Sequence, residues 1–255
     1  MIIRKSAGEI EAMARAGRVV VETIGIVGEA IAPGVTTAEL DELAEEHIRS
    51  QGGEPTFKGY RGFPASICAS PNDMVVHGIP GSYRLAEGDV LSIDVGVTLD
   101  GLVADSAHTF GVGETDLEAQ RLLEVCEGAL LAGIGEAQPG NHVGDVSAAV
   151  QRTTEAAGFS VVRSLVGHGV GRSMHEEPQV PNFGEPGRGP KLVPGMTIAI
   201  EPMITAGSEE VFVADDGWSI HTRDGSLASH FEHTVAVTEA GPRILTEEPV
   251  GSLLP

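Results

Sequence analysis

The chain has 255 residues, a hydrophobic content of 41% and a formal net charge of −21 at pH 7. This length and composition are typical of a globular protein with a sizeable core. The acidic balance excludes a general nucleic-acid binder, which needs a basic face. No stretch approaches the ~18 consecutive apolar residues of a membrane span, and the first 17 residues contain no apolar signal core.

The two cysteines, Cys68 and Cys126, form neither a disulfide scaffold nor a C-x-x-C site, so a reducing compartment is expected. We therefore predict a soluble, cytoplasmic protein with no nucleic-acid or membrane partner. A monomer is expected because nothing in the sequence demands a partner subunit.

Two amphipathic helices are predicted in the first quarter of the chain, at residues 7–31 and 37–53, with a Pro-Gly break between them. The same plan recurs at residues 115–137 and 144–159. Gly34 aligns with Gly140 and Gly52 with Gly158, both at an offset of 106 positions. The strand-like runs 85–94 and 192–201, which end in Asp94 and Glu201, repeat at an offset of 107 positions.

This repeat has two interpretations. Generic amphipathic segments can resemble each other by chance. Alternatively, the chain has two halves of α+β type, about 1–113 and 114–255, which close one site around an approximate two-fold axis. Because no Ser/Gly-rich or charged linker separates the halves, we predict a single α/β domain over residues 1–255.

Three carboxylates lie in apolar runs with strand character: Asp94 in VLSIDVGV, Glu201 in MTIAIEPMI and Glu232 in ASHFEHTVAV. Burial without a partner costs about 2–7 kcal/mol even for a neutral polar group. The chain has only 16 Lys and Arg residues to offer as partners. Several buried acids with few bases indicate a metal site.

A fourth carboxylate follows from a predicted hairpin over residues 90–111, in which Asp100 and Gly101 form the two-residue turn. This register places Gly96 opposite Asp105. Asp94 and Asp105 then become diagonal neighbours on one face, roughly 7–8 Å apart at the backbone. The alternative is an exposed hairpin face, but Gly96 opposite Asp105 leaves room that such a face does not need.

The stretch VGHGVGRSMHEEPQVPN contributes His168 and His175. It fails the dinucleotide-binding pattern at Arg172 and the H-E-x-x-H zinc pattern at Gln179. Four carboxylates and an imidazole suit two divalent ions about 3.5–4 Å apart that activate a water for hydrolysis. Oxygen-rich ligands accept manganese, iron, cobalt or zinc.

These motifs, namely IDVGVTLDGLVADSAHTF, VGHGVGRSMHEEPQV, IAIEPMI and HFEHTVAVTE, resemble those of the methionine aminopeptidases, most closely the bacterial type I form. The resemblance covers nearly the whole chain. It implies the pita-bread fold, in which two pseudo-symmetric halves of helices and antiparallel sheet surround a dinuclear metal site. It also implies removal of the N-terminal methionine of nascent polypeptides when the second residue is small, with transient contact to the ribosome.

The resemblance assigns the metal ligands. Asp94 would chelate one ion, Asp105 and Glu232 would bridge both, and His168 and Glu201 would complete the other. Glu201 would also act as general base and proton shuttle.

The resemblance also gives roles outside the ligand set. His175 would hydrogen-bond the scissile carbonyl as it becomes an oxyanion, and His77 would hydrogen-bond the substrate peptide group. The methionine side chain would bind among Tyr60, Phe63, Cys68, Met174 and Trp218. From the residues alone, His175 remains equally a loop histidine, Trp218 a loop anchor and Cys68 a small buried hydrophobe.

Three positions depart from the family pattern: Met174 is usually aromatic, Phe57 is usually smaller, and Ala107 ends a D-S-A sequence that is more commonly D-T-S. The first two change the expected shape of the pocket. The other histidines are predicted to be structural or surface residues, although His230 and His233 could also contact Glu232 and hold its side chain in place.

Two alternatives stay open. Aminopeptidase P and prolidase share the fold and ligands but usually carry a large additional amino-terminal domain, whereas this chain is expected to start almost directly with the catalytic fold. A non-catalytic binding protein on the same fold would typically lose ligands, and all five are present.

Overall fold

The computed structural model describes residues 2–247, so Met1 and residues 248–255 of the predicted domain lie outside it. The four predicted helices are confirmed, with ends that differ by at most three residues: α1 (Ala7–Ala30), α2 (Thr37–Ser50), α3 (Leu117–Glu136) and α4 (Val143–Ala156). Ser6 and Thr36 start α1 and α2 as members of capping boxes with Glu9 and Glu39. None of the helices within 2–247 is long and apolar enough to cross a bilayer.

The strands form four sheets. The first contains β1 (Glu54–Pro55), β4 (Val90–Leu99), β2 (Cys68–Pro71) and β5 (Leu102–Gly111), with β4 paired to the other three. The second has five strands in the order β15 (Gly241–Ile244), β14 (His233–Thr238), β9 (Thr197–Ile200), β7 (Val166–Gly169) and β8 (Glu176–Pro181).

The other two sheets have three strands each. One has the order β13 (Ala228–His230), β10 (Met203–Thr205) and β6 (Ser160–Val161). The other has the order β11 (Val211–Val213), β12 (Ile220–Thr222) and β3 (Met74–Val76). A short 3-10 turn, η1 (Tyr60–Gly62), lies between β1 and β2.

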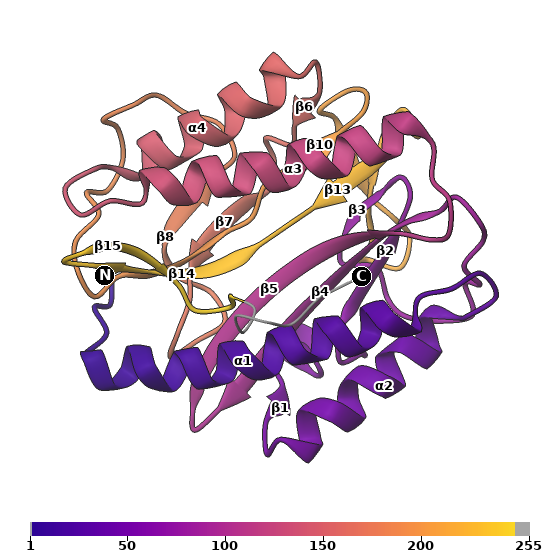
Figure 1. The fold of residues 1–255 in the computed structure, drawn as a ribbon, viewed down its shortest axis with the longest axis horizontal. Helices are drawn as coiled ribbons and strands as arrows, with labels where there is room; N and C mark the ends of the chain where they lie inside the picture. Colours follow the sequence, from indigo (N-terminus) through magenta and orange to yellow (C-terminus); the bar gives the residue numbers. More distant parts are fainter. Residues whose placement is uncertain (1, 248–255) are drawn as a thin grey trace.

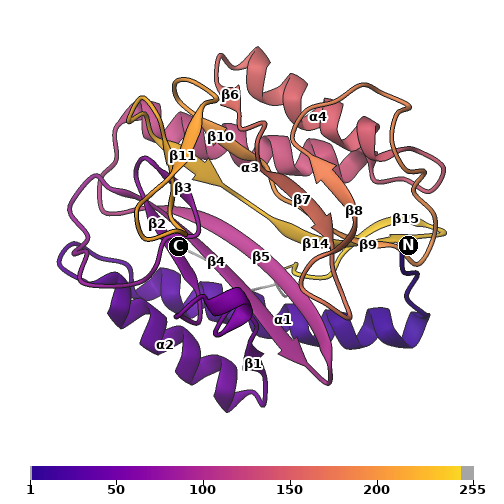
Figure 2. The same cartoon turned by 180° about the vertical axis from the view of Figure 1, so that it is seen from behind.

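The helices cover one face of the strands, with α1 beside β4 and β5, α2 beside α1 and β1, α3 beside β10 and β13, and α4 beside β6 and β8 (Figure 1). The opposite face of the strands is free of long helices (Figure 2). Apolar helix faces pack on the sheets in two main cores, one beneath α1 and α2 and one beneath α3 and α4. Mixed helix and sheet content confirms the predicted α/β class.

The predicted hairpin is confirmed in its register. Leu99 pairs with Leu102 and Gly96 with Asp105, and the turn residues Asp100 and Gly101 both have positive φ values, 53° and 76°. Two positive φ values match the type I′ turn that suits the right-handed twist of paired strands. Asp94 and Asp105 therefore share the face that lies away from α1.

Two strands change sheet at the centre of the molecule. β9 and β14 pair in the five-stranded sheet, and their continuations β10 and β13 pair in a three-stranded one. Glu201 and Pro202 separate β9 from β10, and Phe231 and Glu232 separate β13 from β14. The sequence predicted strand at both acids, but each lies at a break, in part because Pro202 cannot donate to a ladder.

The glycines matched by the repeat adopt matched conformations. Gly34 and Gly140 have φ values of 96° and 101°, and Gly52 and Gly158 have 75° and 86°. Side chains are disfavoured at such angles, so each pair marks an equivalent helix end or break. These pairs support our proposal of one domain with two related halves, about 1–113 and 114–255.

Candidate metal centre and active site

Four carboxylates converge between the hairpin and the five-stranded sheet. Asp94 comes from β4, Asp105 from β5, and Glu201 and Glu232 from the two breaks just described. Each has one buried oxygen atom with no hydrogen-bond partner among residues 2–247. Buried polar atoms in folded proteins are nearly always paired, so four unpaired carboxylate oxygens in one place require another partner.

Backbone contacts fix these acids. The Thr234 hydroxyl donates to the Asp105 carbonyl and accepts from the Asp105 N–H at 2.9 Å. The Glu232 N–H donates to the carbonyl of Ala107 at 2.9 Å. Because Thr234 and Glu232 belong to the second half of the chain and Asp105 to the first, these bonds hold the two sets of acids in register.

Burial and mutual repulsion make the acids resist ionisation. Burial raises the pKa of Asp94 to about 7. Burial, and then the charges of neighbouring carboxylates, raise the pKa values of Asp105, Glu201 and Glu232 well above their usual range. Within residues 2–247 no Lys or Arg side chain forms an ion pair with these acids, and of the basic side chains only the neutral rings of His168 and His230 lie within 4 Å of them.

His168 presents a lone pair to the same acids. Its Nδ1 lies 2.9 Å from the carbonyl oxygen of Gly169, which can only accept a hydrogen bond, so Nδ1 carries the proton. Burial lowers the pKa of His168 to about 4, which keeps Nε2 unprotonated. That lone pair lies 3.4 Å from Glu201 Oε1 and 3.9 Å from Asp105 Oδ2.

These donors fit a metal ion. Asp105, His168 and Glu232 each place a ligand atom within 4.8 Å of the others. A lone pair and several carboxylate oxygens that face one another repel unless a cation lies between them. Asp94 and Glu201 line the same space and add further oxygen donors. The structure thus brings all five residues of the predicted ligand set to one place.

His175 lies next to this cluster, with its ring centroid 4.2 Å from that of His168. Its Nδ1 and the Tyr60 hydroxyl are hydrogen-bonded at 2.9 Å, and the two rings are stacked. Burial, and then the charge of Arg61, lower the pKa of His175, which favours a neutral imidazole. When Tyr60 donates to Nδ1, the proton is on Nε2, which is then free to donate to a substrate oxygen.

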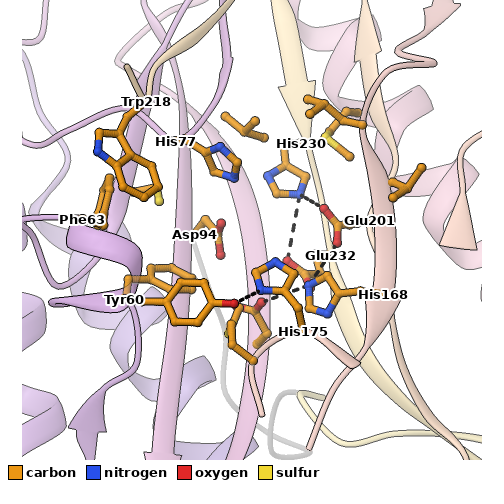
Figure 3. A pocket seen from close by; sticks show the side chains of 18 of the residues that line it. Tyr60, Phe63, His77, Asp94, His168, His175, Glu201, Trp218, His230 and Glu232 are labelled. Atoms are coloured by element: carbon orange, nitrogen blue, oxygen red, sulfur yellow. Dashed lines mark hydrogen bonds and ion pairs between the residues drawn. The ribbon is translucent and has the colours of Figure 1, made fainter. Parts of the chain in front are cut away.

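An apolar cavity of about 280 Å³ adjoins the acids. Tyr60, Phe63 and Trp218 lie on one side of it, and His168, Glu201 and Glu232 lie on the other (Figure 3). The ring of Phe63 meets that of Trp218 edge to face at 5.1 Å. Every residue predicted for the side-chain pocket lines this cavity, as does His77: Tyr60, Phe63, Cys68, Met174 and Trp218.

His77 lies at the end of β3 in the same cavity, with a φ of 61°. A positive φ is uncommon for a residue other than glycine and often marks a functional position. Burial lowers the pKa of His77 to about 4, so its ring is neutral near pH 7. The neutral ring can donate one hydrogen bond and accept one.

Two of the three departures from the family pattern, Phe57 and Met174, change the cavity wall. A Cβ on Gly96 would lie 2.7 Å from the Phe57 ring, so the space opposite Asp105 is occupied by Phe57. Met174 is 5% exposed and packs in the same cluster. Phe57 therefore narrows the cavity beside the hairpin, and Met174 supplies a flexible thioether where an aromatic ring was expected.

Sequence reasoning understated His230. The residue is 2% exposed, and neither ring nitrogen has a hydrogen-bond partner in the described part of the chain. Nε2 lies 3.8 Å from Glu201 Oε2 and 3.9 Å from Glu232 Oε2. In the sequence, only the position of His230 two residues before Glu232 indicated that it could lie near the acids. His233, in contrast, faces the helices and hydrogen-bonds Thr246 at 2.9 Å.

Arg61 is a second residue that the sequence did not single out. It lines the mouth of the cavity, where its guanidinium lies 5.3 Å from the centroid of the Tyr60 ring. Arg61 has a φ of 49°, and Gly59 and Gly62 also have positive φ values. Because this segment is neither a regular helix nor a strand, its sequence has no periodic pattern that could have predicted the position of Arg61.

A buried acidic cluster with an imidazole, beside an apolar cavity that opens to solvent, defines a metallohydrolase site. Comparison with known proteins makes this specific. The sequence profile of metallopeptidase family M24 matches residues 11–239. Methionine aminopeptidase of Clostridium perfringens is 52% identical over 246 residues, which cover 96% of this chain and 99% of the relative. Methionine aminopeptidase 1 of Bacillus subtilis is 50% identical with the same coverage.

The fold agrees with these relatives. The crystal structure of methionine aminopeptidase from Thermotoga maritima superposes with a TM-score of 0.96 at 45% identity, over 97% of this chain and all of the other. The chain therefore belongs to metallopeptidase family M24 and, within it, to the methionine aminopeptidases. It has the pita-bread fold, as the sequence resemblance implied.

The alternative M24 branch matches less well. Prolidase from Pyrococcus horikoshii superposes with a TM-score of 0.78 at 22% identity, and the match covers only 65% of that chain. Identity at this level shows a common fold alone.

Proposed function

We propose that the protein is a metal-dependent aminopeptidase that hydrolyses the bond after the N-terminal methionine of nascent polypeptides when the second residue is small. The convergence of four unpaired buried carboxylates and the His168 lone pair beside an apolar cavity carries this proposal. Membership of the methionine aminopeptidases supports it.

Two divalent ions are proposed to bind here, held by Asp94, Asp105, His168, Glu201 and Glu232, because five donors with four carboxylates exceed what one tetrahedral ion takes. Cobalt, manganese, iron and zinc all suit this donor set. Such ions polarise a carbonyl group and lower the pKa of an attacking water.

The cavity would bind the methionine side chain. Phe63 and Trp218 offer apolar ring surface, and Cys68 and Met174 offer sulfur and methyl contacts. Burial of a side chain there directs the following peptide group toward the acids. The apolar wall also excludes water other than the attacking one, which strengthens hydrogen bonds to the reacting atoms.

Three side chains would handle charge and protons. His175 is proposed to donate from Nε2 to the scissile carbonyl oxygen as negative charge develops there. His77 would hydrogen-bond the substrate peptide group. Glu201 would accept the proton of the attacking water and deliver it to the leaving amine, because it lies within 3.4 Å of His168 Nε2 and faces the cavity.

Substrate choice tests the proposal. Metal-replete protein is expected to release methionine from Met-Ala-Ser and to release much less from Met-Leu-Ser, as measured by amino-acid analysis. A peptide with proline at the second position, such as Leu-Pro-Ser, serves as the comparison. Faster cleavage before proline than after methionine would move the protein to the prolidase and aminopeptidase P branch.

A cytoplasmic location, a monomeric state and transient ribosome contact stay predictions.

A further inference from the structure

The loop between β7 and β8, residues 170–175, carries two side chains of the proposed site, Met174 and His175. The loop has no regular secondary structure of its own, and His175 lines the cavity with part of its side chain exposed to solvent. Its shape therefore depends on contacts made by neighbouring segments. Those contacts come mainly from Glu176, the first residue of β8, and from the amino-terminal segment of the chain.

Glu176 uses both carboxylate oxygens to hold this loop. Oε1 accepts hydrogen bonds from the backbone N–H groups of Arg172 at 2.7 Å and Ser173 at 3.1 Å. Oε2 accepts from Lys5 Nζ at 2.5 Å. The side chains of Lys5 and Glu176 are only 1% and 5% exposed, so this is a buried ion pair rather than a surface one.

Lys5 is itself held in place. Its backbone N–H donates to the carbonyl of Gly195 at 2.6 Å, which attaches the amino-terminal segment to the second half of the chain. Its side chain crosses directly over Gly171, where an added Cβ would lie 2.3 Å from Lys5 Cε. A side chain at position 171 would therefore displace the Lys5 side chain from its present path to Glu176.

A second contact ties the same loop to α1. The Arg172 guanidinium donates two hydrogen bonds to Glu9 Oε1, at 2.9 and 2.6 Å. The loop carbonyl of Gly171 accepts from the N–H of Val103, two residues before Asp105, at 2.7 Å. The loop is therefore fixed relative to both the amino-terminal segment and the hairpin that carries the acids.

We infer that Lys5 is a positioning residue for the reaction: through the buried Lys5–Glu176 ion pair it holds the 170–175 loop so that His175 faces the scissile carbonyl and Met174 faces the substrate side chain. This inference rests on the proposed function. His175 directly precedes Glu176, and adjacent Cα atoms are about 3.8 Å apart, so a shift of Glu176 reaches His175 at once. A displacement of about 1 Å at a reacting group can reduce a rate by 10²-fold.

Two single variants and their combination test the inference. Lys5→Met leaves an unpaired buried carboxylate, and Glu176→Gln leaves an unpaired buried ammonium, so each is expected to lower kcat for Met-Ala-Ser at least tenfold. Lys5→Met/Glu176→Gln is neutral at both positions, and its amide oxygen still accepts from Arg172 and Ser173. The double variant is therefore expected to be more active than either single variant, a non-additive result.

Two readouts separate positioning from loss of metal or of fold. The affinity for Mn²⁺ and the absorption spectrum of bound Co²⁺ are expected to change less than twofold, because no ligand is touched. Arg15→Met is the matched control, since it removes an exposed cation that pairs with Asp100 rather than with a residue of the loop. It is expected to keep the unaltered kcat.

Amide hydrogen exchange gives a test that needs no turnover. In Lys5→Met the backbone amides of Arg172 and Ser173 are expected to exchange at least tenfold faster, while amides of β4 and β5 exchange as before. Unchanged exchange at the two loop amides, or unchanged kcat in both single variants of an active enzyme, would overturn the inference. If the unsubstituted protein does not cleave Met-Ala-Ser, the proposed function fails, and the exchange result still decides whether Lys5 holds the loop.

Discussion

Glu201→Gln is expected to lower kcat for Met-Ala-Ser by about 10²–10⁴-fold, the range typical for loss of a general acid–base group. The amide retains the size of the side chain and one oxygen donor, but it cannot accept the proton of the attacking water. Glu201 lies at the break between β9 and β10, with one buried oxygen unpaired and the other facing His230. The measurement is the steady-state rate of methionine release.

Glu185→Gln is the matched control, because it makes the same chemical change at an exposed residue that pairs with the exposed Arg188. It is expected to leave kcat unaltered. Metal binding by the Glu201 variant must be measured in parallel, since the residue is also a proposed ligand. Near-normal turnover by Glu201→Gln with metal bound would contradict the proposed role of Glu201 in proton transfer.

His175→Ala is expected to lower kcat by about 10²–10³-fold, the usual loss when one oxyanion donor is removed. KM for Met-Ala-Ser should change much less, because the hydrogen bond to the carbonyl strengthens only as charge develops. A higher KM with an unaltered kcat would instead show that His175 only helps to bind the substrate.

Two variants sharpen this result. Tyr60→Phe keeps the stacked ring but removes the hydroxyl bonded to His175 Nδ1, so a smaller loss of kcat is expected. His221→Ala removes a histidine that pairs with Asp73 outside the proposed site and should leave kcat unaltered. A loss in His221→Ala equal to that in His175→Ala would point to a general structural effect.

Much of the site could be predicted because local rules place it. The Asp100–Gly101 turn sets the hairpin register, and strand alternation then puts Asp94 and Asp105 on one face. Acids within apolar runs and few available bases indicated a metal before any resemblance was considered. The paired glycines in the two halves showed where each helix would end.

Other features depend on contacts between distant segments and leave no local pattern. The sheet change at Glu201 and Glu232 results from the pairing of four strands, not from the composition of either run. The Lys5–Glu176 pair joins residues 171 positions apart. Phe57 could be named as a departure, but only the packed structure shows that its ring fills the space over Gly96.

The central claim is that the buried acids bind divalent metal and that methionine release depends on it. The most direct test removes all metal, adds Mn²⁺ or Co²⁺ stepwise, and measures bound metal and methionine release from Met-Ala-Ser in the same samples. No release without metal, and release that rises in step with occupancy, is the predicted result. Release that is unaffected by metal removal would contradict the claim, and metal binding without any release would make the protein a binding protein on this fold.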